Sequence, residues 1–243
     1  MKQAICEKMK KIILTLIIYT FLIPGFVFAK NNVDISLIEA IKTEDVESLR
    51  QLLKDKEVIK KQLDPICDPH ALCKPIVEAA RKGSTEMVAL LIEAGADVEG
   101  AGGFAKDTAL ILATMQKDFK MAELLVKNSA DVNQPNYFGA TPFWGACAMG
   151  LYDFVKLYIF QKADINYPGR FPDPLQKDNE EKRPIIENIT PLMIASFNGH
   201  LKVVELLMRN GANINIKDTK KRIALDYAKA NGNPQVIKFL NGD

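Results

Sequence analysis

The sequence predicts an all-α array of stacked helix pairs, and three observations support this fold class. Segments with the same start, middle and end recur along the chain, with openings at positions 74, 108, 141, 190 and 223. Within each segment, apolar residues recur at helical spacing. Small residues stand at matching places early in each segment, where they would let neighbouring helices approach closely. Such a period is typical of folds in which each unit buries its apolar face against the next.

The clearest unit spans residues 190–215. Thr190 can cap a helix with its hydroxyl, and Pro191 suits the first helical turn because its missing N–H has no helical partner there. Gly199 permits a tight turn before a second helix. Gly211 can end that second helix in the left-handed conformation. We expect Leu206 to lie on the buried face of the second helix.

Copies of this unit fill most of the chain. Thr141, Thr108 and Lys74 open copies upstream, and a weaker copy opens near Ile223. An atypical first copy, residues 37–53, has two apolar helices without the Thr-Pro start. We place the copies near residues 34–66, 74–106, 107–139, 140–167, 190–221 and 222–243, within a repeat domain of residues 30–243.

The motifs T-P-L-x-x-A, G-H-x-x-V-V-x-x-L-L and G-A-D/N-I/V-N, with a 33-residue period, resemble the ankyrin repeat. The resemblance covers about residues 34–240. It implies a solenoid of about six stacked helix pairs joined by hairpin-like fingers, with a concave side lined by the fingers and the first helices. The small residues expected between first helices are Ala79, Ala80, Ala113, Ala146, Cys147, Ala195 and Ser196.

Some copies depart from the repeated pattern. Ser129 and Lys162 stand where glycines end the second helices of other copies, and Lys117 replaces the mid-repeat glycine. A left-handed conformation at a residue with a side chain costs on the order of 1 kcal/mol. We therefore expect the middle of the array to be its less regular part.

The N-terminus carries a second pattern. Lysines precede an uncharged run, residues 12–29, which Pro24 and Gly25 interrupt before a small-residue ending at Ala29. This order is typical of a secretory signal peptide, residues 1–29, cleaved after Ala29. The alternative is a retained membrane anchor, since the run is about the minimum length that spans a bilayer. With cleavage, we expect a periplasmic or secreted protein without membrane contact.

The net charge of the chain argues against a nucleic-acid partner. The full chain carries a formal net charge of +2, and removal of residues 1–29 with four lysines and one glutamate leaves 28 basic and 29 acidic residues. The mature chain is therefore nearly neutral and lacks the basic surface of a nucleic-acid-binding protein. The basic run 220–222 is short and flanked by aspartates, so we interpret it as a solvated finger tip.

Three cysteines follow the expected cleavage site. In an oxidising compartment, Cys67 and Cys73 would form a disulfide that closes a small loop. Free thiols, or a metal site that also uses His70, are the alternatives, although the spacing matches no strong zinc pattern. Cys147 occupies a small-residue position, so we expect a buried, inert thiol.

The sequence lacks the constellations that carry catalysis. The chain has only two histidines, and no glycine-rich phosphate loop follows a strand. Acidic pairs such as Glu180 and Glu181 lie in a charged, proline-rich stretch that we interpret as a solvated loop. We predict no enzyme activity, no cofactor and no metal.

A binding surface is the remaining hypothesis. Tyr137 and Phe138 stand at a finger tip, where packing requires no aromatic residue, and exposed aromatics are common interface anchors. Residues at the ends of the first helices form a second set of candidates, and three of them would make an apolar stripe. This set consists of Arg81, Met115, Met149 and Phe197. The alternative is that these side chains fold back as local core.

The wide spacing between the openings at 141 and 190 contains an insert, within residues 168–189. Its prolines and charges argue against a regular finger. It could contact a partner or form a mobile solvated loop, and the sequence does not favour either.

These patterns together predict an exported bacterial protein that binds a protein partner, as a monomer. A role in assisting or protecting a periplasmic enzyme is the specific hypothesis. The alternatives are a secreted effector that binds a host protein and a membrane-tethered structural scaffold. The bacterial assignment depends on the Lys/Ile/Asn-rich composition and on the compact signal.

Overall fold

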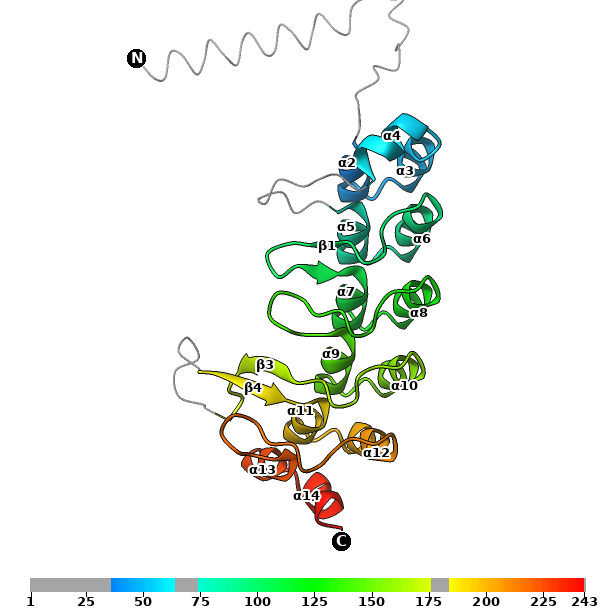
Figure 1. The fold of residues 1–243 in the computed structure, drawn as a ribbon. Helices are drawn as coiled ribbons and strands as arrows, with labels where there is room; N and C mark the ends of the chain where they lie inside the picture. The colour runs from blue at the N-terminus through cyan, green and yellow to red at the C-terminus, as the bar shows by residue number, and fades with distance from the viewer. Residues whose placement is uncertain (1–35, 64–73, 176–183, 243) are drawn as a thin grey trace, which may run out of the picture. The chain divides into compact units, whose positions relative to one another are not determined.

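The computed structural model describes residues 36–63, 74–175 and 184–242. This part of the chain is a stack of helix pairs (Figure 1). The pairs are α2 (Leu37–Lys42) with α3 (Val46–Leu52), α5 (Pro75–Arg81) with α6 (Thr85–Glu93), α7 (Ala109–Met115) with α8 (Phe119–Lys127), α9 (Pro142–Ala148) with α10 (Tyr152–Phe160), α11 (Pro191–Phe197) with α12 (Leu201–Arg209), and α13 (Ala224–Ala230) with α14 (Pro234–Asn241). A short extra helix, α4 (Lys56–Gln62), follows the first pair.

The elements form three layers. The first helices of the pairs stack on one another, the second helices form an outer layer, and the fingers project on the other side of the first helices (Figure 1). Two fingers contain antiparallel strands: β1 (Ala101–Gly102) with β2 (Asp107–Thr108), and β3 (Gly169–Pro172) with β4 (Ile185–Ile189). The all-α prediction therefore needs correction to a mostly helical fold with two small sheets.

Threonine caps start three of the first helices, as the repeated opening predicts. The hydroxyls of Thr108, Thr141 and Thr190 each accept a hydrogen bond from the backbone N–H three residues on, at 3.3, 3.0 and 3.3 Å. Each of these threonines is buried. The cap satisfies a backbone donor that has no helical partner, which is worth about 1 kcal/mol.

The core lies between the two helices of each pair and between consecutive pairs. The small residues expected between first helices are all buried: Ala79, Ala80, Ala113, Ala146, Cys147, Ala195 and Ser196. Larger side chains from the second helices, such as Leu91, Leu125 and Leu207, close the other side of this core. Each pair therefore depends on its neighbours for burial of its apolar face.

The middle of the array is as regular as its flanks, so that expectation was wrong. Ser129, Lys162 and Lys117 do take left-handed conformations, with φ of 70°, 63° and 60°. However, α7 and α9 have seven residues like α5 and α11, and α8 and α10 have nine like α6 and α12. The free-energy cost of a left-handed backbone at these three positions is small compared with the free energy that packing of the whole layer contributes.

A ladder of hydrogen bonds joins successive copies beyond the second helices. In each rung, a side-chain oxygen of one copy accepts a backbone N–H of the next. The bonds run from Asp131 N to Glu99 Oε1 (2.7 Å), from Asp164 N to Asn133 Oδ1 (2.7 Å) and from Asn213 N to Asn166 Oδ1 (2.8 Å). Glu99 stands where the other rungs have asparagine, and burial together with the nearby carboxylates raises the pKa of Glu99.

The described ends of the insert, residues 168–175 and 184–189, contain a strand pair. β3 and β4 pair antiparallel, with Arg170 opposite Glu187 and Phe171 opposite Ile186. Trp144 holds the base of this hairpin: its ring stacks on Phe171 at 3.7 Å between centroids, and its indole N–H donates to the Ile189 carbonyl at 3.2 Å. For these described residues, the expectation that no regular finger forms was therefore wrong, because Trp144 of the preceding copy supplies an aromatic ring on which the hairpin packs.

A buried ionic network ties the insert to the last finger. Arg222 donates to Asp173 at 3.0 Å and to Asp218 at 2.6 Å, and Lys220 donates to Asp173 at 2.8 Å. Tyr227, which is fully buried, donates its hydroxyl to Asp218 at 2.7 Å. The interpretation of residues 220–222 as a solvated tip was thus wrong for Arg222, whose side chain is largely buried. It fits Lys221 and Lys220, which are exposed, although Lys220 also pairs with Asp173.

Both carboxylates of this network are held in the ionised form. Burial alone would favour the protonated acids, but hydrogen bonds to Lys220, Arg222 and Tyr227 outweigh it and lower the pKa of Asp173 and of Asp218. Buried charges that are well paired are costly to break, because removing one partner leaves the other without compensation.

Truncation of Leu207 tests the inter-copy core. Leu207 is fully buried, so Leu207→Ala should lower the free energy of unfolding by about 2–5 kcal/mol. Leu206, expected from sequence to be core, is only half-buried and lines an outer groove, so Leu206→Ala should cost clearly less. Chemical denaturation of both variants measures the difference, and equal losses would contradict this assignment of the core.

The network predicts a stability that depends on acid pH. Because the pKa of Asp173 is lower in the folded state than in the unfolded chain (about 3.9), its stabilising contribution is present above about pH 4. That contribution is lost as the pH falls through the folded-state pKa. Asp173→Asn should therefore unfold more easily than the wild type at pH 7, and the gap should narrow toward pH 2. Thermal melts across this pH range provide the measurement, and a constant gap would mean that Asp173 is not ionised in the fold.

Candidate functional site

Three exposed aromatic side chains meet on the tips of two neighbouring fingers. Phe104 lies between β1 and β2, and Tyr137 and Phe138 lie on the next finger; their exposed fractions are 84%, 69% and 50%. The ring of Phe104 is 6.3 Å from that of Tyr137 and 6.1 Å from that of Phe138, and the Tyr137 and Phe138 rings are 5.5 Å apart edge-on. We call these three residues the finger-tip aromatic cluster.

Local hydrogen bonds fix the backbone beneath the cluster. The Asn136 side-chain oxygen accepts from the N–H groups of Phe138 and Ala140, at 3.0 and 2.9 Å. Its amide nitrogen donates to Asp107 on the preceding finger at 2.8 Å, and Tyr137 N donates to the Ala105 carbonyl at 2.7 Å. The two tips are thus joined to one another, and the aromatic rings stand on a braced support.

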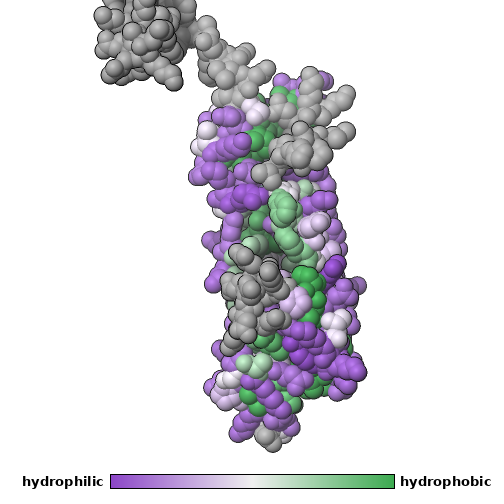
Figure 2. Space-filling view, turned by 90° about the vertical axis from the view of Figure 1, so that its left-hand side faces the viewer, coloured by the Kyte–Doolittle hydropathy of each residue, from purple (hydrophilic) through white to green (hydrophobic). Residues whose placement is uncertain are grey.

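A groove continues from the cluster toward the insert hairpin. It has a volume of about 620 Å³ and runs between the finger at residues 135–139 and strand β3. Tyr137 and Phe138 line one side, Arg170 and Ile185 the other, and Tyr167 also contributes. Arg170 forms an exposed ion pair with Glu187 at 3.4 Å. In Figure 2, which looks at the finger side, hydrophobic residues gather in the middle of the face, between hydrophilic regions.

The second set of candidate binding residues lies at the ends of the first helices. These residues are less uniformly exposed than the sequence predicts. Met115, at the end of α7, is 59% exposed, whereas Met149 and Phe197 are half-buried. Arg81 is exposed and pairs with Glu78 on its own helix at 3.2 Å. The predicted apolar stripe is therefore strong at Met115 and weaker at the two following copies.

A repeated amide contact at these helix ends is missing beside Met115. In three copies, an amide side chain donates to carbonyls at the end of the preceding first helix. The bonds run from Gln116 to Ala80 (3.1 Å), from Asn198 to Ala148 (2.8 Å) and from Asn231 to Phe197 (2.8 Å). Met149 occupies this position in its copy and has no amide to donate. The end of α7 therefore lacks the amide donor that the other three copies supply.

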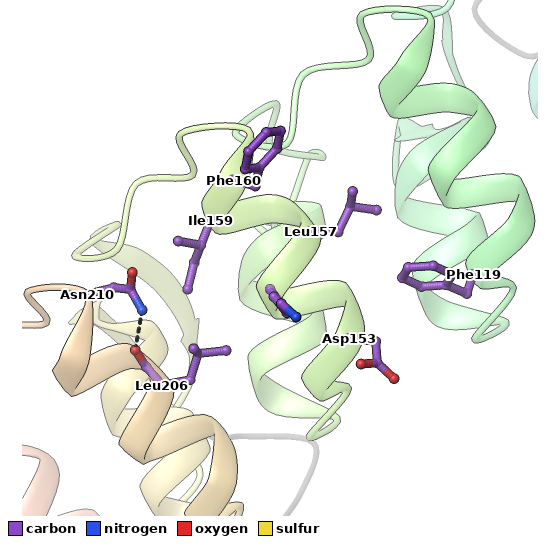
Figure 3. A pocket seen from close by; sticks show the side chains of 8 residues that line it. Phe119, Asp153, Leu157, Ile159, Phe160, Leu206 and Asn210 are labelled. Atoms are coloured by element: carbon purple, nitrogen blue, oxygen red, sulfur yellow. Dashed lines mark hydrogen bonds between the residues drawn. The ribbon is translucent and has the colours of Figure 1, made fainter.

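A second groove lies in the outer layer, on the opposite side from the fingers. It has a volume of about 680 Å³ and is lined by Leu157, Ile159 and Phe160 of α10 and by Leu206 of α12. In Figure 3, Ile159 lies on the α12 side near Leu206, whereas Leu157 points to the other side of α10, toward Phe119 of α8. Phe160 is 83% exposed. Phe119 of α8 and Asn210, which donates to the Leu206 carbonyl at 2.7 Å, complete this part of the lining. We call this the outer groove.

Sequence reasoning missed Phe104 and Phe160. A residue-by-residue alignment of the copies contains a signal for Phe160, because the same helix position holds Glu93, Lys127 and Arg209 in other copies. Phe104 gives a weaker signal, since finger tips vary in length and composition.

The described residues contain no catalytic arrangement that we recognise, and no group of three or more His, Cys, Asp or Glu there could hold a metal ion. His200 has a structural contact, with Nε2 at 3.0 Å from the Ala148 carbonyl oxygen. Cys147 is fully buried, and burial raises the pKa of its thiol, as expected for an inert cysteine. Cys67, Cys73, His70 and the Glu180–Glu181 pair lie outside the described residues. None of the described helices is long and apolar enough to cross a membrane.

Comparison with known proteins gives consistent matches. The chain is 28% identical over 220 residues to alpha-latrotoxin-Lg1a of Latrodectus geometricus, which covers 76% of this chain and 15% of that protein. It is 31% identical over 115 residues to the human ankyrin repeat and KH domain-containing protein 1, covering 47% of this chain and 4% of that protein. A putative ankyrin repeat protein of fowlpox virus is 28% identical over 188 residues, covering 77% of this chain and 50% of that protein.

In each case the chain spans half or less of its relative, so the match concerns the repeat array and not the whole relative. A family model described as ankyrin repeats (3 copies) matches residues 37–136, 76–169 and 171–242. These ranges cover nearly all of the helix pairs described above. The chain therefore belongs to the ankyrin-repeat family, whose arrays are protein–protein interaction modules.

Proposed function

We propose that this chain is an exported, non-enzymatic module that binds a protein partner through the finger-tip aromatic cluster and the adjoining groove. The observation that carries the proposal is the exposure of Phe104, Tyr137 and Phe138 on a support that hydrogen bonds hold in place. Packing of the array does not require these rings. A bound partner would therefore bury these rings, which are exposed to water in the free protein.

Physical considerations support a binding role for such a cluster. Aromatic side chains bury a large area and lose few rotamers on binding, so they dominate the energy of many interfaces. Because Asn136 and the backbone bond from Tyr137 already fix the tip, little further entropy is lost when a partner docks. Met115, Met149 and Phe197 extend the candidate surface along the ends of the first helices.

Export is the second part of the proposal. Residues 1–29 have the order of a secretory signal, and we propose cleavage after Ala29 into the periplasm or the medium. Assistance or protection of a periplasmic enzyme is one role that fits a binding module there. A secreted effector that binds a host protein, or a scaffold that keeps residues 12–29 as a membrane anchor, would use the same array.

We also propose a disulfide between Cys67 and Cys73. The two residues are six positions apart, and an oxidising compartment favours their pairing. Such a bond would fix the segment that enters the second copy.

Substitution of the cluster tests the binding site. Phe104→Ala and Tyr137→Ala should each weaken binding of the partner by about 1 kcal/mol or more, because exposed aromatic anchors lose their buried contact. Unfolding free energies should stay within about 0.5 kcal/mol of the wild type, since neither ring is part of the core. Titration against a partner captured from the native compartment gives the affinity, and a thermal melt gives the stability.

Tyr152→Ala is the matched control for that experiment. Tyr152 is an exposed tyrosine on α10, in the outer layer away from the fingers, so its truncation should leave the affinity unchanged. If Tyr152→Ala and Tyr137→Ala weaken binding equally, or if neither does, the finger tips do not form the interface.

Mass measurement of the native protein tests export and the disulfide together. The exported protein should begin at Lys30, and under non-reducing conditions it should be lighter than the reduced chain by two hydrogen atoms. A mass that includes residues 1–29 would favour the anchored scaffold. An unchanged mass on reduction would exclude the Cys67–Cys73 bond in that compartment.

A further inference from the structure

The outer layer of helices carries a surface that the proposed protein-binding role does not use. At the ninth position of α6, α8, α10 and α12 stand Glu93, Lys127, Phe160 and Arg209. Three of these residues are charged, as expected for a solvated helix face. Phe160 alone is apolar, and 83% of it is exposed.

Basic residues surround Phe160 in the repeat geometry. Lys127 and Arg209 occupy its position on the two flanking helices, Lys156 precedes it by one turn, and Lys162 follows it by two residues. Arg209 has an ion pair with Glu205 at 3.5 Å, and Arg209 remains largely exposed. The exposed lysines around this ring have no ion pair among the described residues.

Charge is distributed unequally along the outer layer. Helices α8, α10, α12 and α14 together carry six basic and three acidic residues, a net charge of +3. Helices α3 and α6 carry one basic and three acidic residues, a net charge of −2. The exposed phenylalanine therefore lies in the positive half of the layer.

We propose that this face docks on the surface of an anionic phospholipid bilayer. An aromatic ring within a basic surface matches the apolar interior and the negative headgroups of such a membrane, and each lysine near an anionic surface adds to the attraction. Ile159 and Leu206, which line the outer groove together with Phe160, add apolar surface beside the ring. The finger-tip aromatic cluster, on the opposite side of the first helices, stays free for a protein partner (Figure 1).

A bilayer fits this face better than a folded protein. Phe160 stands at the edge of the outer groove, at the end of α10, and most of the ring is exposed, so its burial needs a surface that the ring can enter. The lysines are long and flexible, and a fluid headgroup layer imposes no fixed geometry on them. From the sequence we expected no membrane contact for the mature chain, and this proposal replaces that expectation.

Fluorescence of a single tryptophan tests the proposal at one position. Trp144 is the chain's one tryptophan, so Phe160→Trp in a Trp144→Phe background reports on position 160. With vesicles of phosphatidylcholine and phosphatidylglycerol, emission of this variant should shift to shorter wavelength and be quenched by brominated lipid. With phosphatidylcholine alone, it should remain unchanged at the same lipid concentration.

Phe104→Trp in the same background is the matched control, because Phe104 is equally exposed but lies on a finger tip. Its emission should not respond to either vesicle. This control also separates docking by the outer face from attachment through residues 12–29, which would not bring position 160 in particular into the bilayer. Neutralisation by Lys127→Gln with Lys156→Gln should lower the vesicle affinity about 25-fold, at about fivefold for each lysine.

Three results would overturn the proposal. The first is an unchanged emission of the Phe160→Trp variant with anionic vesicles, which would point to a protein partner at this face. The second is an equal response of the Phe104→Trp variant. The third is a blue shift without vesicles that grows with protein concentration, which would mean that a second copy of the chain covers Phe160.

Discussion

Contact between consecutive helix pairs is the constraint on which the rest of the structure depends. A pair of seven- and nine-residue helices cannot bury its own apolar face, so stability comes from the interface with the next copy. This is why small residues such as Ala113 and Ala146 are buried between first helices, and why hydrogen bonds from a backbone N–H of one copy to a side-chain oxygen of the preceding copy recur. The positions that repeat between copies therefore maintain the stack of helix pairs. Only the positions that vary between copies can have another function.

The departures from the repeat consequently carry most of the information about function. Met149 removes an amide contact that three other copies keep, and it leaves the end of α7 beside exposed Met115. Phe160 replaces a charged residue on the outer face. The insert between the fourth and fifth copies departs most, yet it is integrated into the array: Trp144 supports one end of its hairpin, and the Asp173–Arg222 pair ties it to the last finger. The insert is thus a fixed part of the finger side, and its residues Arg170, Pro172 and Ile185 line the groove next to the aromatic cluster.

The sequence predicted the parts of the fold that depend on local signals. Helix starts at Thr108, Thr141 and Thr190 and the left-handed stop at Gly211 follow from residue type and spacing, and the structure has both. Features that depend on contacts between distant residues could not be predicted. Asp173 and Arg222 are 49 residues apart, and nothing in their local context distinguishes a buried pair from two solvated charges. For the same reason Leu206 was assigned to the core, since helical spacing alone cannot tell a residue that faces the next copy from one that lines an outer groove. At the candidate site, Tyr137 and Phe138 could be identified because they break the pattern of a finger tip, whereas their packing against Phe104 depends on how two neighbouring fingers fold.

The two exposed apolar surfaces lie in different layers, and this separation follows from the architecture. Fingers project from one side of the first helices and the second helices cover the other, so an array of this kind has two independent faces (Figure 1). A substitution on one face leaves the inter-copy core unchanged, and therefore also the other face. The binding free energies of the two faces should then be independent and additive. If both proposals hold, a protein held by the finger tips would be retained at a membrane surface by the outer helices. The affinity of each contact could then be modest, since joining two weak contacts in one molecule raises the effective concentration of the second.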